Sequence, residues 1–207
     1  MLQADNISVY YGDERVLDCF SCHIERGAFA CVTGVSGCGK TSLLKAFMGL
    51  APLAKGSIRV GEYVLDEQTC SAIRKQVSYL PQDLALPYDT VFEAVAHVLK
   101  IGGLRYDYAA SLLLRENLAK LGLEEDLLDK RMVEISGGQR QRLVLAVLAL
   151  LNREVWLLDE PTAALDRASR DYVIKFLLEQ QQRGKTIVAV SHDVWFAAQC
   201  SETIQLG

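Results

Sequence analysis

The stretch "GVSGCGKT", Gly34 to Thr41, combines glycines, a lysine and a threonine between an apolar run and a segment with helical spacing. Glycines, Lys and Ser/Thr at this spacing are typical of a loop that binds phosphate. The glycines let the backbone approach phosphate oxygens closely, and the N–H groups at the start of the following helix attract anions. We therefore expect Lys40 to reach the β- and γ-phosphates of a nucleotide and the Thr41 hydroxyl to bind Mg²⁺.

Two carboxylates follow a second apolar run. "VWLLDE", Val155 to Glu160, has the length of a strand and ends in Asp159 and Glu160. Open α/β sheets bind ligands beyond the carboxyl ends of their strands. We expect Asp159 to hold Mg²⁺, directly or through water, and Glu160 to polarise the water that attacks the γ-phosphate. Carboxylates after an apolar run can also be helix caps, so this run indicates nucleotide chemistry only in combination with the phosphate loop.

Polar residues also follow two further strand-like runs. "VSHD" places His192 where a γ-phosphate is expected, so we predict a phosphate contact in preference to a core role. "YLPQD" offers Gln82, whose amide oxygen suits Mg²⁺, although a turn residue explains the same pattern equally well. The other histidines, His23 and His97, are most simply read as packing or surface residues.

A second glycine-containing stretch, "ISGGQ", lies far downstream at residues 135–139. It has two interpretations. Ser136 is a suitable N-cap for the helix that follows, with the glycines forming a turn. Alternatively, the start of that helix binds an anion. A single nucleotide cannot obviously use both loops, because a helical segment separates them in sequence.

The order of patterns along the chain predicts an α/β fold. The segment before the phosphate loop reads as strands joined by polar turns, and Leu43, Leu44 and Phe47 lie on one face of the helix after it. Residues 83–134 are mostly helical in period, and the helix after "ISGGQ" is apolar on nearly all sides. Strand-length apolar runs alternating with helices indicate a parallel sheet covered on both faces.

The composition excludes several classes of protein. The 207 residues carry a net charge of -4, which argues against binding nucleic acid. The longest apolar run, Leu143 to Leu151, is about half of the roughly 20 residues that a membrane-spanning helix needs, and no secretory signal is visible. We therefore expect no direct insertion into a membrane.

The six cysteines are read as reduced residues of a cytosolic protein. "CFSCH", Cys19 to His23, matches a c-type haem attachment pattern, but residues three apart on a strand point to opposite faces and would not share a ligand. Cys38 differs because it lies in the phosphate loop, where its oxidation or alkylation should block nucleotide binding.

Over nearly its whole length the chain resembles the ATP-binding-cassette ATPases of ABC transporters. "GVSGCGKT" resembles the family's Walker A motif, "YLPQD" its Q-loop, "ISGGQ" its signature, "VWLLDE" its Walker B motif, "AALD" its D-loop and "SHD" its H-loop, in the family's order. The resemblance implies one ABC ATPase domain: a phosphate-loop NTPase core with a mostly parallel sheet and an N-terminal antiparallel β subdomain (1–82 and 140–207), and an inserted helical subdomain (about 83–139).

The resemblance also implies roles for individual residues. Tyr11 matches the aromatic residue that stacks on adenine, although neighbouring Tyr10 leaves this open. The phosphate cradle corresponds to Gly34, Val35, Ser36, Gly37, Cys38, Gly39, Lys40, Thr41 and Ser42. Contacts to ATP on a second cassette correspond to Ser136, Gly137, Gly138 and Gln139. Glu160 matches the catalytic base, His192 the γ-phosphate switch, and Asp166 the D-loop residue that links two sites, while Thr41, Gln82 and Asp159 would hold the metal.

By the same resemblance, the cofactors are ATP and Mg²⁺, and two cassettes pack head to tail as a homodimer or heterodimer. A transmembrane permease subunit would dock within roughly residues 83–100 and hold the ATPase at the cytoplasmic face of the cell membrane. A soluble ABC-type ATPase in iron–sulfur cofactor assembly is the alternative. A small-molecule phosphate-loop kinase would leave "ISGGQ" and "SHD" unexplained.

Departures from the family pattern are small. Ile135 replaces the usual Leu, Thr41 the more frequent Ser, and Ala163 a common Ser, and none of these changes removes a required functional group. With Glu160 and His192 present, we expect a hydrolysing site. The sequence stops at "TIQLG", so we expect no C-terminal regulatory domain of the kind that some importer ATPases carry.

Overall fold

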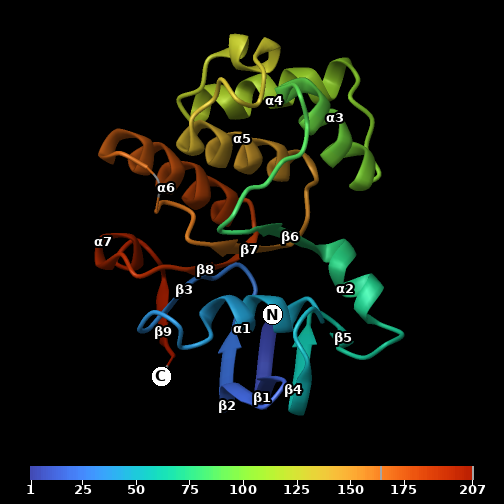
Figure 1. The fold of residues 1–207 in the computed structure, drawn as a ribbon, viewed down its shortest axis with the longest axis vertical. Coiled ribbons are helices and arrows are strands. Elements are labelled where there is room, and N and C mark those ends of the chain that lie inside the picture. Colours follow the sequence, from blue (N-terminus) through green and yellow to red (C-terminus); the bar gives the residue numbers. More distant parts are fainter. Residues whose placement is uncertain (164, 207) are drawn as a thin grey trace.

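The computed structural model describes residues 1–163 and 165–206, which form two β-sheets with one helix between them, two helices over the outer face of one sheet, and a helical lobe at one end (Figure 1). This arrangement confirms the expected α/β class. Within the described part of the chain, no helix combines the length and the apolarity that crossing a membrane requires.

The first sheet is antiparallel and has the order β2-β1-β4-β5. Its strands are β1 (Leu2–Tyr11), β2 (Glu14–Ile24), β4 (Leu53–Val60) and β5 (Tyr63–Val64). Strands β1 and β2 form a hairpin around Gly12 and Asp13, in which Tyr11 pairs with Glu14. Gly12 has φ 61°, a conformation that suits glycine at such a turn.

The second sheet is parallel in every pair and has the order β6-β7-β8-β3-β9. Its strands are β3 (Phe29–Thr33), β6 (Val77–Leu80), β7 (Val155–Asp159), β8 (Thr186–Val190) and β9 (Glu202–Gln205). Because parallel strands share one carboxyl edge, the loops after β3, β6, β7 and β8 meet there. All the polar motifs expected to bind nucleotide, except the signature, follow one of these four strands.

Alternating side chains along the parallel strands contribute to two different cores. On β7, Trp156 and Leu158 face one core, while Val155 and Leu157 face the other. The first core includes α5 and α6, and the second includes α1 and the antiparallel sheet. Because both faces are covered, strands β3, β7 and β8 read as continuous apolar runs rather than as alternating ones.

Helix α1 (Lys40–Phe47) lies between the two sheets, as Figure 1 shows. Leu43, Leu44 and Phe47 are fully buried, which confirms the face predicted from their spacing. Helix α2 (Cys70–Gln76) was not expected. It is short, and only Ile73 in it is buried, so its sequence carries little helical periodicity.

The lobe contains α3 (Val91–Ile101), α4 (Tyr108–Lys120) and the 3₁₀ helix η1 (Glu125–Asp129). Helix α3 begins with a capping box, in which the Thr90 hydroxyl accepts from the Glu93 N–H and the Glu93 carboxylate accepts from the Thr90 N–H. An isolated bridge between Thr90 and Arg131 joins the start of α3 to the chain just before α5. This bridge therefore connects the two ends of the lobe before the signature segment begins.

Helices α5 (Gly137–Leu150) and α6 (Arg167–Gln182) cover the outer face of the parallel sheet, and α7 (Val194–Ala197) follows β8. No residue of α5 from Gly138 onward is exposed, which confirms the prediction of a buried helix. Helix α5 also contacts α4 and α3, so the same helix packs against the lobe and against the sheet.

Candidate functional site

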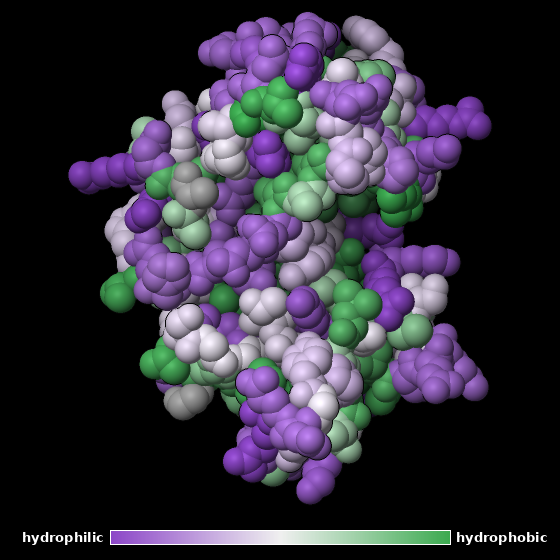
Figure 2. All heavy atoms as spheres, in the orientation of Figure 1, coloured by the Kyte–Doolittle hydropathy of each residue, from purple (hydrophilic) through white to green (hydrophobic). Residues whose placement is uncertain are grey.

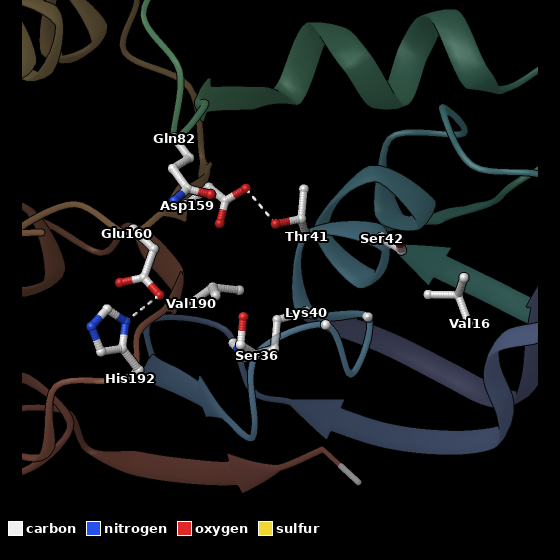
Figure 3. Close-up of a pocket in the computed structure, with 12 residues that line it drawn as sticks. Val16, Ser36, Lys40, Thr41, Ser42, Gln82, Asp159, Glu160, Val190 and His192 are labelled. Atoms are coloured by element: carbon white, nitrogen blue, oxygen red, sulfur yellow. Dashed lines mark hydrogen bonds and ion pairs between the residues drawn. The ribbon is translucent and has the colours of Figure 1, made fainter.

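A cavity of about 350 Å³ lies at the carboxyl edge of the parallel sheet, where Figure 3 shows the side chains that surround it. The loops after four strands supply its walls. It is lined by Val16, Ser36, Gly37, Gly39, Lys40, Thr41, Ser42, Gln82, Asp159, Glu160, Val190 and His192. Residues from three separate predicted motifs and from the phosphate loop thus meet at one place.

The phosphate loop has the backbone conformation that its glycines predict. Gly37 and Gly39 have φ of 82° and 101°, in the left-handed region that favours glycine. The Lys40 ammonium donates to the carbonyls of Gly34 (2.9 Å) and Val35 (2.8 Å) and lies 4.0 Å from the Cys38 sulfur. Its charge is therefore held within the loop, at the N-terminus of α1, where an anion is favoured.

Thr41, Asp159 and Gln82 lie together on one side of the cavity (Figure 3). The Thr41 hydroxyl donates to Asp159 Oδ2 at 2.7 Å, whereas Asp159 Oδ1 is buried without a hydrogen-bond partner in the part of the chain that the structure describes. Burial raises the pKa of the Asp159 carboxyl, an effect that the Thr41 hydrogen bond opposes.

The donor set fits Mg²⁺. This ion prefers oxygen ligands and is usually held by one or two carboxylates together with substrate phosphates. A hydroxyl, an amide and one carboxylate with a buried, unpaired oxygen suit such a site. No group of three or more His, Cys, Asp or Glu side chains that could hold a metal occurs among the described residues.

Glu160 and His192 form the other side of the cavity. The Glu160 carboxylate lies 2.9 Å from Nδ1 of His192, which is exposed, whereas Glu160 is buried. Glu160 has φ 50°, an uncommon conformation for a residue other than glycine, and such strain concentrates at functional sites. The carboxylate thus stands at the sheet edge, close to the phosphate loop and to the histidine.

The signature segment lies outside this cavity. Ser136 is the N-cap of α5 and forms a capping box with Gln139: the Ser136 hydroxyl accepts from the Gln139 N–H at 3.1 Å, and the Gln139 side chain accepts from the Ser136 N–H at 2.9 Å. Gly137 has open space around it, with nothing within 4 Å of the position of an added Cβ. The structure therefore confirms Ser136 as the N-cap, but it places Gly137 and Gly138 in the first turn of the helix rather than in a separate turn.

Five other predicted residues do not line the cavity: Tyr11, Asp166, and Gly34, Val35 and Cys38 of the phosphate loop. Tyr11, at the end of β1, is 42% exposed. The β-strand that follows it contributes Val16 to the cavity wall instead, a residue with no sequence signal. The Asp166 side chain caps α6 by accepting from the Ser169 N–H at 2.7 Å, and this hydrogen bond lowers the pKa of Asp166. Ala164, within the "AALD" motif, lies outside the described residues.

One buried polar residue at the site was not predicted. Gln141, on α5, donates from its side-chain amide to the Glu160 carbonyl at 2.8 Å. It lies between Arg140 and Arg142 in the polar start of the helix, before the apolar run from Leu143, so its residue type does not distinguish it from its neighbours in the sequence.

Comparison with known proteins agrees with this site. The family model described as ABC transporter matches residues 17–163. The chain is 32% identical to a zinc transport system ATP-binding protein, TroB, of Treponema pallidum, over 99% of this chain and 77% of that protein. It is 34% identical to a phosphonates import ATP-binding protein, PhnC, of Trichormus variabilis, over 90% of this chain and 80% of that protein. These relatives give no support to the iron–sulfur assembly alternative.

The fold comparison leads to the same family. A dimeric structure of the ATP-binding cassette MJ0796 in a post-hydrolysis state, bound to ADP and Pi, superposes with a TM-score of 0.89 at 28% identity, covering 100% of this chain and 94% of that one. The chain therefore belongs to the ABC transporter family, as an ATP-binding subunit that hydrolyses ATP to power transport through a partner membrane subunit.

Proposed function

We propose that two cassettes bind two ATP molecules between them, each held by the phosphate loop of one and the signature of the other. The observation that carries this proposal is the separation of the two anion sites. None of the signature residues 136–139 lines the phosphate-loop cavity. A partner cassette placed head to tail, as a second copy or as a related chain, would supply the missing contacts.

Within each site, catalysis would rest on position and charge. Lys40 would exchange its two loop carbonyls for phosphate oxygens, and the backbone N–H groups of the loop would bind the same phosphates. Glu160 would orient and polarise the attacking water, and His192, within hydrogen-bond distance of Glu160, would contact the γ-phosphate. These are the roles that the family resemblance implies, and their proximity in one cavity supports them.

Thr41, Asp159 and Gln82 would hold Mg²⁺. When bound, the ion would neutralise charge on the β- and γ-phosphates. The unpaired oxygen of Asp159 supports this assignment, because a buried carboxylate oxygen without a partner is costly unless a ligand satisfies it.

A transmembrane permease is the second proposed partner, and it would keep the ATPase at the cytoplasmic face of a membrane. Figure 2 shows hydrophobic atoms where the lobe adjoins the core. The lobe exposes Phe92 and Ile101 on α3 and Leu112 and Leu113 on α4, with exposed fractions between 46% and 76%. Of these residues only Phe92 lies within the segment 83–100 that we expect to dock, and we propose that the docking surface extends from that segment over the inserted helical subdomain, for which we retain the boundaries of about 83–139.

The transported substrate would be chosen by the permease. The two relatives described above are named for zinc and for phosphonates, a cation and a class of anions, at nearly the same identity to this chain. Because cassettes about equally similar to this chain belong to transporters of such different substrates, we propose that the cassette supplies the energy of transport and the permease its specificity.

The test compares two variants. Glu160→Gln keeps the size of the side chain but removes the carboxylate, so we expect ATPase activity to fall by about a hundredfold or more and an ATP-dependent dimer to accumulate. Lys40→Ala should not form this dimer, because ATP binding is lost. Size-exclusion chromatography with light scattering at saturating Mg-ATP measures both. A Glu160→Gln protein that stays monomeric would contradict homodimerisation, and mixing with other cassettes would then identify a heterodimer.

A further inference from the structure

Gln141 connects the helix that carries the signature to the backbone of Glu160. It is only 6% exposed, and its Nε2 donates to the Glu160 carbonyl at 2.8 Å. The orientation of the amide follows from chemistry, because only its NH₂ group can donate to a carbonyl. A buried amide is retained at such a position only when its hydrogen bond offsets the cost of burial.

The backbone of Glu160 needs this support. Its φ of 50° is unfavourable for a residue with a side chain, so the surroundings must hold it. On one side, the Glu160 N–H donates to the Val190 carbonyl on β8 at 3.0 Å. On the other, the Glu160 carbonyl accepts from Gln141 at 2.8 Å and, less closely, from the Ala163 N–H at 3.3 Å. Two of these three hydrogen bonds join backbone groups, and the one from Gln141 comes from a side chain on α5.

The direction of the Glu160 side chain depends on this peptide geometry. In Figure 3 the carboxylate points toward His192 and the cavity. If the carbonyl loses its partner on α5, the peptide can relax toward an ordinary φ, which would turn the carboxylate away from the cavity. The hydrogen bond from Gln141 therefore acts on the orientation of Glu160 and not on nucleotide contacts.

We propose that Gln141 is a positioning residue for Glu160, and that it couples the signature to the chain's own hydrolytic site. Gln141 lies two residues after Gln139 on the same helix, so a contact that moves the start of α5 also moves the donor to Glu160. A partner's ATP bound at the signature would thus influence hydrolysis at the opposite site. This inference rests on the proposed role of Glu160 as the base.

A second observation supports the position of Gln141 in this coupling. A further cavity, of about 450 Å³, is lined by residues from the Q-loop, α5 and the segment after β7. Gln141 and Gln82 both line it, and the Oε1 atom of Gln141 is buried without a partner among the described residues. Gln141 thus borders the same cavity as Gln82 of the Q-loop and Glu160.

The test uses two substitutions at Gln141 and one elsewhere. Gln141→Met keeps the length of the side chain and removes the donor, and we expect kcat to fall by about tenfold with KM for Mg-ATP unchanged. Gln180→Met is the matched control. Gln180 is also a buried glutamine, 3% exposed, but its Nε2 has no hydrogen-bond partner among the described residues, so its substitution tests the loss of a buried amide without the loss of a bond. Its backbone carbonyl accepts from the Lys185 N–H before β8, at the edge of the sheet opposite to Glu160. Its kcat should stay within about twofold of wild type.

Gln141→Glu adds a pH readout that a merely structural role would not produce. A protonated carboxyl donates to the Glu160 carbonyl, whereas an ionised one cannot and repels the Glu160 carboxylate. Because burial raises the pKa of such a carboxyl, kcat relative to wild type should decrease from about pH 6 to about pH 8. Gln141→Met should show a constant ratio over the same range.

The outcomes separate the two proposals. If Gln141→Met keeps wild-type kcat while Glu160→Gln is inactive, the positioning role is wrong and the base assignment stands. An equal loss in Gln180→Met would also overturn the positioning role, since general packing would explain it. If Glu160→Gln hydrolyses ATP normally, the assignment of the base itself fails. Should Gln141→Met not fold, the pH profile of Gln141→Glu decides, and a flat profile would overturn the inference.

Discussion

Helices α1 and α5 both begin where a phosphate is expected, yet their first turns differ. The N-cap of α1 is Gly39, with φ 101° and no side chain to satisfy the free N–H groups. The N-cap of α5 is Ser136, whose hydroxyl and backbone N–H are both engaged by Gln139. The N-terminus of α1 also lies in the cavity that contains Asp159, whereas Gly137, the first residue of α5, borders the second cavity beside the Q-loop, and among the described residues nothing lies within 4 Å of its added Cβ.

This difference indicates which site one chain completes by itself. At α1, no capping side chain competes for the backbone donors, so they are available to an anion as soon as it arrives. At α5, the capping box satisfies the N–H groups of Ser136 and Gln139 and keeps the helix start ordered. On the proposed head-to-tail arrangement, the second site would gain its ligand only when a partner cassette binds.

The largest expected effect comes from adding one methyl group at each helix start. In Gly39→Ala, the new Cβ would lie 2.8 Å from the Val16 carbonyl oxygen, at a φ that L residues rarely adopt. We expect kcat/KM for Mg-ATP to fall on the order of a hundredfold or more, because the loop can no longer hold its phosphate-binding shape. Binding of a fluorescent ATP analogue to the monomer would measure the loss directly.

Gly137→Ala is the matched change at α5. Nothing lies within 4 Å of its added Cβ, and alanine favours a helix, so the free energy of unfolding should rise by up to about 1 kcal/mol. Binding of the analogue to the monomer should remain normal, while ATP-dependent dimerisation and hydrolysis decrease. Loss of monomer binding in Gly137→Ala would show that the two helix starts serve one nucleotide.

Asp159→Asn should separate stability from activity at the α1 site. Because the pKa of Asp159 is raised, its protonated form stabilises the folded protein below the ordinary aspartate pKa, and this contribution is lost as pH rises through the raised value. At neutral pH the buried charge is therefore a cost that Asn removes. We expect a higher Tm without nucleotide at pH 7, with the difference disappearing in acid, and a loss of Mg²⁺-dependent hydrolysis of about a hundredfold.

Thermal unfolding at several pH values, with and without Mg-ATP, checks this prediction. Stabilisation by Mg-ATP should be smaller in Asp159→Asn than in the wild type. An unchanged Mg²⁺ response would contradict the assignment of Asp159 as a metal ligand.

The smallest effects are expected from removing a single cap. Ser136→Ala and Thr90→Ala each break a capping box, at α5 and α3, and should each lower the free energy of unfolding by about 1 kcal/mol. Of the two variants, only Ser136→Ala should also reduce ATPase activity, because α5 is expected to contact a nucleotide and α3 is not. Chemical denaturation and basal ATPase assays compare the two, and equal activity losses would count against a ligand at the signature.

Much of the fold was predictable because its signals are local. The apolar runs of β3, β7 and β8, the buried face of α1 and the buried α5 each follow from periodicity or continuous apolarity. Helix α2 escaped prediction because one buried residue, Ile73, leaves no periodic pattern. The order of the strands in the parallel sheet was not predicted, since apolar runs carry no record of which strand is their neighbour.

The site shows the same division. Lys40, Thr41, Asp159, Glu160, Gln82 and His192 were all identified from sequence, and the structure brings them to one cavity. Gln141 was not predicted because its partner is a backbone carbonyl. Every residue has such a group, so the sequence does not mark which one is bound. A backbone conformation such as φ 50° at Glu160 is equally invisible from residue types, because glutamate has no preference for it.

By itself, the sequence determined the phosphate loop, the capped start of α5 and the family, because turns, caps and motif spacing depend on residues only a few positions apart. Only the tertiary structure decided which groups meet across the molecule. Thr41 donates a hydrogen bond to Asp159, which is 118 positions away in the sequence. Gln141, on α5, donates to the carbonyl of Glu160, directly after β7. Such contacts depend on strand order, register and helix packing, which arise from burying both faces of the sheet at once.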